Sequence, residues 1–411
     1  MADARPTLLF YCQHSLGIGH LTRSFALVNG LTQAFRVVFL NGGRLPPGVP
    51  VPPDMELIDL PPLGMDDGHT VVSRDARHGV HAAMAERQRL IACAVATTRP
   101  AVLLVELFPF GRKKFAGEIL PLIRAARRQP GGPARVVCSL RDILVDARPD
   151  QQHHDDRARW LADRYFDAVL VHADPAVARQ EDSFHPTKPM RTPTHYTGFV
   201  VPARAAAAPV RRGRHLLVSA GGGIVGESLL RAVLAARQHL THPLPLRIVA
   251  GPFLPEAVWQ ALLEDTRALA GVELVRHVSD MVAEMRGARA SLSQCGYNTA
   301  LDLVVAAVPA LVVPYETVTE NEQSQRAWRL AELGAMQTLP AAQAALPEAL
   351  AQALLQLLDF TPRVAALGLD GATRSTEILA HLAQLAHLAH SAHPAAVRAP
   401  TRTEDMTCST H

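Results

Sequence analysis

Short apolar runs alternate with helix-length segments along most of the chain. Five runs in the first half predict strands, at residues 8–12, 36–40, 102–106, 135–140 and 168–172. Four segments between them predict helices, at residues 21–32, 76–98, 115–128 and 154–165. The strands are continuously apolar rather than alternating, which favours a parallel sheet with helices on both faces. Two stretches that contain Gly and Pro, residues 42–54 and 61–74, are predicted loops.

The alternation is interrupted once, by a stretch of Ala, Pro and Arg without apolar periodicity. It then restarts, with predicted strands at residues 215–219, 247–250, 273–276, 290–293 and 310–313, and helices at residues 227–239, 255–270, 297–305, 322–333, 347–358 and 374–389. Each half has the usual size of one domain, so we expect two doubly wound, Rossmann-like halves that face each other across a cleft. The expected order is an N-terminal domain, a linker, a second domain, C-terminal helices and a disordered tail, at residues 1–200, 201–214, 215–360, 361–390 and 391–411.

Composition narrows the class of protein. With 48% hydrophobic and 19% charged residues, the 411-residue chain is neither collagenous nor wholly disordered. The 41 Lys and Arg nearly balance the 38 Asp and Glu, which argues against a nucleic-acid binder. The five Cys form no Cys-x-x-Cys pair, so neither a disulfide framework nor a zinc site is indicated. No apolar run approaches the roughly 18–20 residues that span a bilayer, and we expect a cytoplasmic, bacterial enzyme.

The first predicted strand runs into a glycine-rich turn that contains a histidine. Gly17 and Gly19 let the backbone approach a ligand closely, and the helix that begins there favours an anion. His20 follows Gly19 directly, so the turn is not the dinucleotide-binding fingerprint. With Arg23 one turn later, His20 is poised as an acid or base beside an anion site. A tight strand–helix turn with a solvated histidine is the alternative.

The second half repeats this arrangement. Its first predicted strand ends in three consecutive glycines, Gly221, Gly222 and Gly223. They indicate close approach of a phosphate, and a flexible loop is the alternative. Near the end of this half, Glu322 and Gln323 begin a helix. A carboxylate next to an amide can clamp the vicinal hydroxyls of a sugar, although helix starts are commonly acidic for dipole reasons.

A further helix start in the second half combines small and polar residues. Gly296 and Thr299 stand at its N-terminus, which favours an anion. Asp302 lies one turn further, where it can accept hydrogen bonds from ribose hydroxyls. Cys295 has no visible partner base, so we expect a small packing residue there.

A basic and aromatic segment follows the strand predicted at residues 102–106. Arg112, Lys113, Lys114 and Phe115 suit an anionic lipid headgroup or a polyprenyl diphosphate, and they are candidates for an acceptor or membrane contact. The alternative is a helix start with solvated charges, although cations are unfavourable at that end of a helix.

Other charged clusters are interpreted as structural. Arg141 and Asp142, at the end of a predicted strand, favour an ion pair within their own domain over a contact with an acceptor. His153 and His154 are neighbours that point in different directions, so they favour a solvated surface rather than a metal site.

Taken together, these motifs make the second half similar to the C-terminal domain of the glycosyltransferase 28 family. The similarity runs over residues 197–339 and rests on the Gly-rich loop, a loop at residues 277–281, the Cys-Gly-x-x-Thr-x-x-Asp helix start and the Glu-Gln pair. In the first half, only residues 17–23 match. By this resemblance the donor-binding residues are Gly17, Gly19, Arg23, Gly221, Gly222, Gly223, Val278, Met281, Gln294, Gly296, Asn298, Thr299, Asp302, Glu322 and Gln323.

The resemblance implies a GT-B fold, with two Rossmann-like domains, and inverting transfer of a hexose-type sugar from a UDP-sugar. It implies no metal or other cofactor, with the UDP-sugar as substrate. The acceptor is unidentified, with lipid-linked or anionic molecules as candidates, and peripheral contact with the inner face of the cell membrane is expected. Two residues depart from the family pattern, because Cys295 replaces a Ser and Asp302 replaces a ribose-binding Glu.

A second resemblance keeps another reaction open. The Gly-x-Gly-His-x-x-Arg motif is similar to that of nucleotide-sugar hydrolases of nonulosonate biosynthesis, in which the matching histidine acts on water. Hydrolysis of a UDP-sugar is therefore the alternative to transfer, with His20 catalytic in both. A catalytically silent sugar-nucleotide-binding protein is a third reading, which the joint presence of His20, Asp302, Glu322 and Gln323 argues against.

Overall fold

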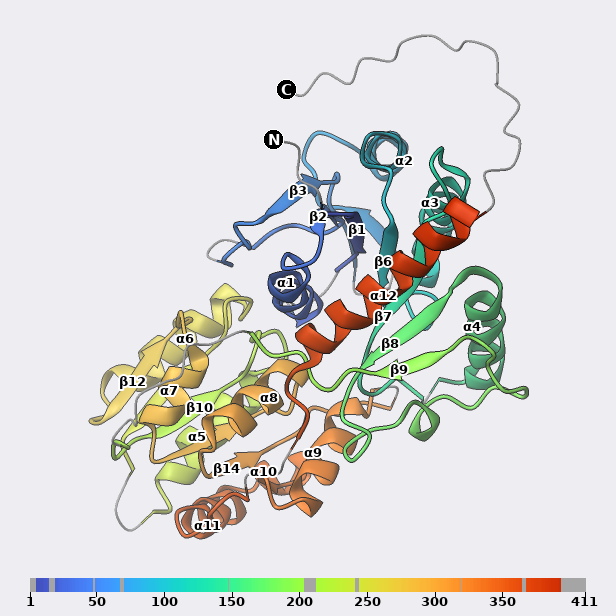
Figure 1. Cartoon of the computed structure of the whole chain (residues 1–411). Helices are drawn as coiled ribbons and strands as arrows, with labels where there is room; N and C mark the ends of the chain where they lie inside the picture. Colours follow the sequence, from blue (N-terminus) through green and yellow to red (C-terminus); the bar gives the residue numbers. More distant parts are fainter. Residues whose placement is uncertain are drawn as a thin grey trace.

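The computed structural model describes residues 5–14, 19–46, 49–66, 70–146, 148–202, 212–240, 244–318, 320–363 and 367–392. Two parallel sheets follow each other along the chain, each covered by helices (Figure 1). The seven-stranded sheet has the order β3-β2-β1-β6-β7-β8-β9 and the six-stranded sheet the order β12-β11-β10-β13-β14-β15. The two-domain α/β prediction is confirmed, and the chain has the GT-B fold.

The first sheet and its helices occupy the N-terminal half. Its strands are β1 (Thr7–Cys12), β2 (Arg36–Asn41), β3 (Met55–Asp59), β6 (Val102–Glu106), β7 (Arg135–Arg141), β8 (Ala168–His172) and β9 (Thr194–Tyr196). Its main helices are α1 (Gly19–Leu31), α2 (Val80–Thr98), α3 (Ala116–Arg128) and α4 (Gln151–Tyr165). All neighbouring strands pair in parallel.

The second sheet occupies the C-terminal half. Its strands are β10 (Leu216–Ser219), β11 (Leu246–Val249), β12 (Val272–Val275), β13 (Ala290–Ser293), β14 (Ala310–Val312) and β15 (Gln337–Thr338). Its helices are α5 (Glu227–Arg237), α6 (Glu256–Arg267), α7 (Met281–Gly287), α8 (Tyr297–Ala306), α9 (Glu322–Glu332), α10 (Ala341–Ala344) and α11 (Pro347–Leu357).

Each sheet reverses its strand order at one point. The reversal lies between β1 and β6 in the first sheet and between β10 and β13 in the second. In open α/β sheets, ligands bind beyond the carboxyl ends of the strands at such a switch point. His20, at the start of α1, follows β1 in the chain, and the three glycines follow β10, so both lie at these positions.

Three sequence predictions need correction. The stretch 61–74 is not only loop, because β4 (Leu63–Met65) and β5 (Val71–Ser73) form an antiparallel hairpin in it. Strand β3 and helix α7 were not predicted, since both are short and β3 follows a Pro-rich stretch. The region expected to hold C-terminal helices contains one helix, α12 (Gly371–Ala392), among its described residues. The tail from residue 393 and most of the linker lie outside the described residues.

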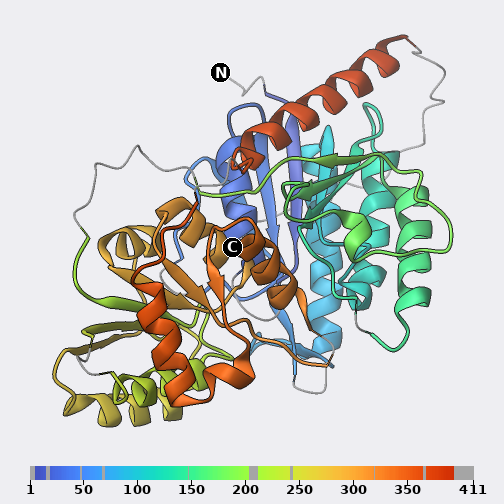
Figure 2. The ribbon, with the colours of Figure 1, turned by 90° about the horizontal axis from the view of Figure 1, so that it is seen from below.

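Helix α12 returns to the N-terminal half (Figures 1 and 2). Val200 and Asp370 form a β-bridge where the chain crosses back, and α12 packs on α1. The contact is close: a Cβ built on Gly30 would lie 3.0 Å from the Cβ of Ala372. The chain therefore crosses between the halves twice, near Val200 and near Asp370.

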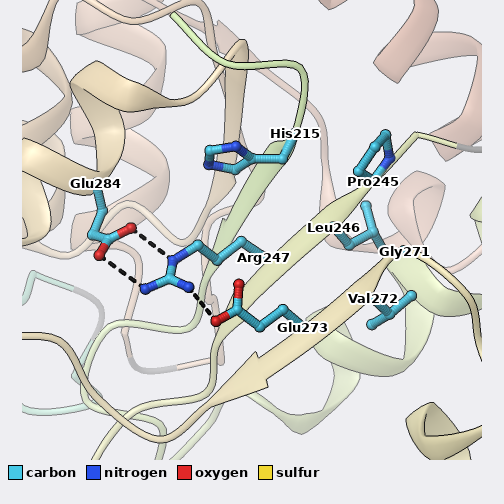
Figure 3. Close-up of a pocket in the computed structure, with 8 residues that line it drawn as sticks. All are labelled: His215, Pro245, Leu246, Arg247, Gly271, Val272, Glu273 and Glu284. Carbon is cyan, nitrogen blue, oxygen red and sulfur yellow. Dashed lines mark hydrogen bonds and ion pairs between the residues drawn. The ribbon is translucent and has the colours of Figure 1, made fainter. Parts of the chain in front are cut away.

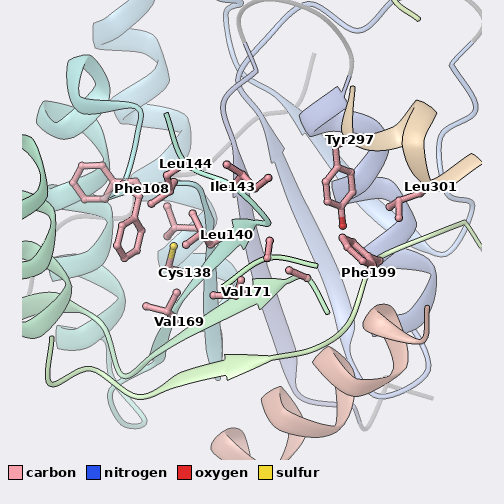
Figure 4. Close-up of a cluster of buried hydrophobic side chains, with 14 of the residues drawn as sticks. Phe108, Cys138, Leu140, Ile143, Leu144, Val169, Val171, Phe199, Tyr297 and Leu301 are labelled. Atoms are coloured by element: carbon pink, nitrogen blue, oxygen red, sulfur yellow. The ribbon is translucent and has the colours of Figure 1, made fainter. Parts of the chain in front are cut away.

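A continuous apolar core joins the two halves. Strand residues such as Leu9, Val105 and Val171 are fully buried, as the continuous apolar runs predict. Tyr297 and Leu301 of α8 belong to the same cluster, and Figure 4 shows Tyr297 beside Phe199 at this junction.

Candidate active site between the two halves

His20 and Glu106 form a close pair at the carboxyl edge of the first sheet. His20 is the second residue of α1 and Glu106 the last of β6. The Nδ1 atom of His20 lies 2.7 Å from Oε1 of Glu106. The side chain of Glu106 is fully buried, whereas 16% of the His20 side chain is exposed. Gly17 lies outside the described residues.

The charges around this pair set its protonation. Burial raises the pKa of Glu106, but His20, Arg23 and Arg112 outweigh it and lower that pKa to about 2. Burial lowers the pKa of His20 to about 4, against the opposing effect of Glu106. At neutral pH, Glu106 is therefore ionised and His20 neutral. The Nδ1–H of His20 donates to the carboxylate, which leaves Nε2 as a proton acceptor.

Sequence reasoning missed Glu106 as a site residue. The available signal was a carboxylate at the end of a continuously buried strand, where a charge needs a partner. Arg23 was expected beside a bound anion, but its side chain is only 2% exposed. Its Nη2 donates to Oε1 of Glu106 over 2.6 Å. It supports the His20–Glu106 pair instead of presenting a free cation to an anion.

The glycine loop after β10 lies beside the N-terminus of α8. Gly221 and Gly223 have φ values of 59° and 91°. A Cβ on Gly223 would lie 2.6 Å from the carbonyl oxygen of Ala250, so only glycine fits there. A Cβ on Gly221 would lie 3.5 Å from Oγ1 of Thr299. The two predicted anion sites of this half are therefore adjacent.

Two side-chain amides near α8 form hydrogen bonds with the backbone of neighbouring loops. Oε1 of Gln323 accepts from the backbone N–H groups of Cys295 and Tyr315, over 3.1 and 3.2 Å. Nε2 of Gln294 donates to the carbonyl of Val225 over 2.9 Å. These contacts fix the loops that surround the start of α8. Burial raises the pKa of Cys295 to about 12, so it is a packed thiol as predicted.

The remaining predicted donor residues line the same region. Gly296 is the N-cap residue of α8, and Asn298, Thr299 and Asp302 lie half-buried in its first turns. Nδ2 of Asn298 donates across the halves to the carbonyl of Gly19, over 3.4 Å.

Two further predicted residues stand at the start of α7. Val278 is in the loop before this helix, as expected, whereas Met281 is its first residue. Both side chains are half-buried.

Ion pairs connect the halves where an intradomain pair was predicted. Asp142 accepts two hydrogen bonds from Arg326 of α9, at 2.6 and 2.9 Å, and both side chains are buried. Arg141 pairs with Glu322 of the same helix. The intradomain prediction was wrong, because α9 comes from the other half and its approach cannot be read from the local sequence.

The basic and aromatic segment is only partly exposed. Lys113 and Lys114 face solvent, whereas Phe115 is 2% exposed and belongs to the core. The Nε atom of Arg112 lies 3.9 Å from Oε2 of Glu106, so this cation faces the His20–Glu106 pair. Phe108 and the other aromatic residues of the segment are buried too. Of the predicted acceptor or membrane contact, only Lys113 and Lys114 are therefore exposed.

A surface pocket lies away from this site. Its volume is about 550 Å³, and its lining residues come mainly from the amino-terminal ends of β10, β11 and β12 (Figure 3). Arg247 within it is paired with both Glu273 and Glu284. Since ligands of such sheets bind at the opposite edge, we do not assign the donor to this pocket.

Neither a membrane-spanning helix nor a metal-binding cluster occurs among the described residues. No described helix is long and apolar enough to cross a membrane. No group of three or more His, Cys, Asp or Glu residues suited to a metal ion was found among the same residues.

Comparison with known proteins supports one family. Residues 217–375 match the "Glycosyltransferase family 28 C-terminal domain". A UDP-N-acetylglucosamine–N-acetylmuramyl-(pentapeptide) pyrophosphoryl-undecaprenol N-acetylglucosamine transferase of Nitrosospira multiformis is 26% identical over 60% of this chain and 68% of its own. The protein of the same name from Methylococcus capsulatus is 32% identical over 38% of this chain and 43% of its own.

Solved structures show the same fold over nearly the whole chain. Acinetobacter baumannii MurG has a TM-score of 0.53 and 18% identity, covering 92% of this chain and all of its own. UGT71G1 of Medicago truncatula, in complex with UDP-glucose, has a TM-score of 0.58 and 13% identity, covering 93% of this chain and all of its own. At these identities the similarity shows the fold alone.

Proposed function

The chain is a glycosyltransferase of the GT-B fold with a family 28 C-terminal domain, and we propose that it transfers a hexose-type sugar from a UDP-sugar to a hydroxyl acceptor. The observation that carries this proposal is the His20–Glu106 pair, which places a neutral imidazole at the carboxyl edge of the first sheet, next to the residue that contacts Asn298 of α8. The names of the relatives support a UDP-N-acetylhexosamine as donor and a lipid-linked acceptor.

In this mechanism, Nε2 of His20 takes the proton from the acceptor hydroxyl. The acceptor oxygen forms a bond to the anomeric carbon as the bond from that carbon to the diphosphate oxygen breaks, with inversion. The electron pair of the broken bond leaves on the diphosphate. Glu106 holds the imidazole in one tautomer and stabilises the imidazolium that forms.

The leaving diphosphate carries the charge that the second half has to stabilise. We assign this role to the backbone N–H groups at Gly296 and Gly222, with the dipole of α8, rather than to a metal or cofactor. The N–H groups of Gly221 and Gly223 already donate to Oγ of Ser219 and the carbonyl of Ala220, so these two glycines shape the loop. Asp302 would hold the ribose hydroxyls, and Glu322 would reach the sugar once it leaves Arg141.

Two exposed lysines of the N-terminal half are the proposed acceptor contacts. Lys113 and Lys114 are exposed close to Arg112, so they can attract an anionic or lipid-linked acceptor from the inner face of a membrane. No aromatic anchor accompanies them, because Phe115 is buried.

Two measurements test the proposal. UDP should raise the melting temperature more than ADP or GDP, because a ligand at 100 times its Kd stabilises a protein by about 2.7 kcal/mol. UDP release from UDP-N-acetylglucosamine should be slow with donor alone and should accelerate when an acceptor-containing membrane extract is added. Equal shifts for all three nucleotides would refute the donor assignment. Fast release that the extract does not change would favour the hydrolase.

A further inference from the structure

Tyr297, the first residue of α8, lies between groups of both halves. Two guanidinium groups lie over its ring, with their centres 5.4 Å (Arg23) and 5.9 Å (Arg326) from the ring centroid. Arg23 comes from the N-terminal half, and Arg326 is itself paired with Asp142 of that half. Cations over an aromatic face are attracted by the ring quadrupole, most strongly when water is excluded.

The hydroxyl of Tyr297 also attaches α8 to the N-terminal half. It donates to the carbonyl of His172 over 3.0 Å and accepts from the backbone N–H of Val200 over 3.2 Å. The side chain is 7% exposed, and Figure 4 shows it directed toward Phe199 at the junction of the halves. The start of the donor-binding helix is therefore held by residues outside its own sheet.

Arg23 depends on this ring for its position. Its Nη2 bonds Oε1 of Glu106, while its Nε is buried without a hydrogen-bond partner among the described residues. The ring of Tyr297 covers the guanidinium, which is 2% exposed. Removing the ring would let water reach Arg23 and would weaken its bond to Glu106.

We propose that Tyr297 is a positioning residue that holds Arg23 against Glu106, so that docking of the donor-binding helix sets the charge balance around the base His20. This inference rests on the proposed function for the role of His20 as base. The contact that would change is the hydrogen bond between Arg23 and Glu106. Tyr297 acts on His20 only through these two residues.

The direction of the effect follows from the charges that face His20. These are Glu106 on β6, Arg112 in the loop after it, and Arg23 on α1 itself; Glu106 raises the pKa of His20, and both arginines lower it. When Arg23 is solvated, its effect weakens and Glu106 acts more strongly on the imidazole. The pKa of His20 should then rise.

The experiment follows the Cε1–H signal of His20 by NMR in the full chain carrying ¹³C-labelled histidine, with His20→Gln to assign the signal. In Tyr297→Leu, the midpoint should move to higher pH. Tyr297→Phe keeps the ring and should titrate like the wild type. If Tyr297→Leu does not fold, Tyr297→Met removes the ring with a smaller loss of volume, and the same shift is expected.

Activity gives a second readout. The acid limb of the pH profile of kcat should move to higher pH in Tyr297→Leu, and kcat at its optimum should fall about 10- to 100-fold because the base is misplaced. The donor KM should change much less. Tyr297→Phe should restore both.

Phe199→Leu is the matched control, because it removes a buried ring that packs on Tyr297 but has no guanidinium over its face among the described residues. An unchanged His20 midpoint in Tyr297→Leu, or an equal shift in Phe199→Leu, would overturn the proposal. Absence of transfer by the wild type with every UDP-sugar would instead refute the proposed function, while the NMR result would still decide on Tyr297.

Discussion

The carboxyl ends of the two sheets are built from different chemistry. At the end of β6 in the N-terminal half, a buried carboxylate is surrounded by a histidine and two arginines, Arg23 and Arg112. At the end of β13 in the C-terminal half, Gln294 and Gln323 bond backbone groups around a glycine loop. The first edge gathers its buried charges around one histidine. At the second edge the contacts around the glycine loop are neutral, and the buried charge beside it, Arg326, is paired with Asp142 of the other half.

This difference indicates a division of labour. Buried charges shift pKa values and create a group that can accept a proton, which suits catalysis. Glycines let the backbone approach a ligand closely, and the first N–H groups of a helix have no partner within the helix, which suits binding of a diphosphate. Changes in the N-terminal edge should therefore affect turnover, whereas changes in the C-terminal edge should affect donor affinity.

The largest effect is expected from the N-terminal edge. His20→Ala removes the proposed base and should lower the kcat of transfer by about 10²–10⁴-fold, with donor affinity largely kept. Steady-state kinetics and calorimetric titration with UDP would separate the two quantities. A loss confined to donor affinity would instead make His20 a phosphate ligand and erase the contrast between the edges.

The two ion pairs between the halves should differ strongly. Asp142→Ala leaves Arg326 buried without its carboxylate and should lower the free energy of unfolding by about 3–5 kcal/mol. Arg141→Ala breaks a pair whose side chains are 16% and 20% exposed, and should cost about 0–1 kcal/mol. Urea denaturation of both variants measures this, and equal losses would show that burial does not distinguish the pairs.

Much of the fold was predictable from the sequence, because continuously buried strands produce unmistakable apolar runs. The predictions at residues 102–106 and 168–172 coincide with β6 and β8. The hairpin of β4 and β5 was not predicted, because three-residue strands contain too few positions to show an apolar pattern.

The candidate site was predictable only in part. Glycines and a histidine after strands mark turns, and His20 was found in this way. The partners that give it chemistry, Glu106 and the buried Arg23, are distant in the sequence or change role on folding. The pairing of Asp142 with Arg326 depends on how the halves meet, which local sequence does not encode.

Stability should depend on pH through the N-terminal half. Burial lowers the pKa of His20 to about 4 and that of His172 to about 3, from an ordinary value of 6.5. Below pH 6.5 the unfolded chain therefore binds more protons than the folded one, and the free energy of unfolding falls as the pH falls toward 4. His20 alone accounts for about 3 kcal/mol of this loss.

Chemical denaturation between pH 7.5 and 4.5 would measure this slope. The contribution of the buried neutral imidazoles to the free energy of unfolding is fully present above pH 6.5 and decreases below it. His20→Ala should make the profile less steep, because one of the two titrating imidazoles is gone and His172 remains. A slope that is the same in this variant would show that the imidazole is not buried as the structure places it.

A smaller effect is expected at the C-terminal edge. If Asp302 holds ribose hydroxyls, Asp302→Ala should lower UDP affinity by roughly 1.5–3 kcal/mol, about one to two decades, with the fold retained. Asp265→Ala is a matched control, since Asp265 pairs with Arg231 on an exposed surface. Calorimetric titration would compare the two, and equal UDP affinity in both would remove Asp302 from the donor site.

The smallest effect on the folded protein is expected from the two exposed lysines near the N-terminal edge. Changing Lys113 and Lys114 together to Ala should alter the free energy of unfolding by less than about 0.5 kcal/mol, because neither side chain is buried. Arg112 is left intact, since it faces Glu106 and its loss would confound docking with catalysis.

If the lysines attract an anionic acceptor, the acceptor KM of this double variant should rise and its sedimentation with anionic vesicles should weaken. Its UDP affinity should stay unchanged, because the proposed diphosphate and ribose contacts lie in the other half. High salt should likewise raise the acceptor KM and weaken the sedimentation of the wild type, since it screens solvent-exposed charges. The difference between variant and wild type should therefore shrink at high salt. Unchanged acceptor kinetics at low salt would remove the lysines from acceptor binding and leave the contrast between the two sheet edges to His20 and Asp302 alone.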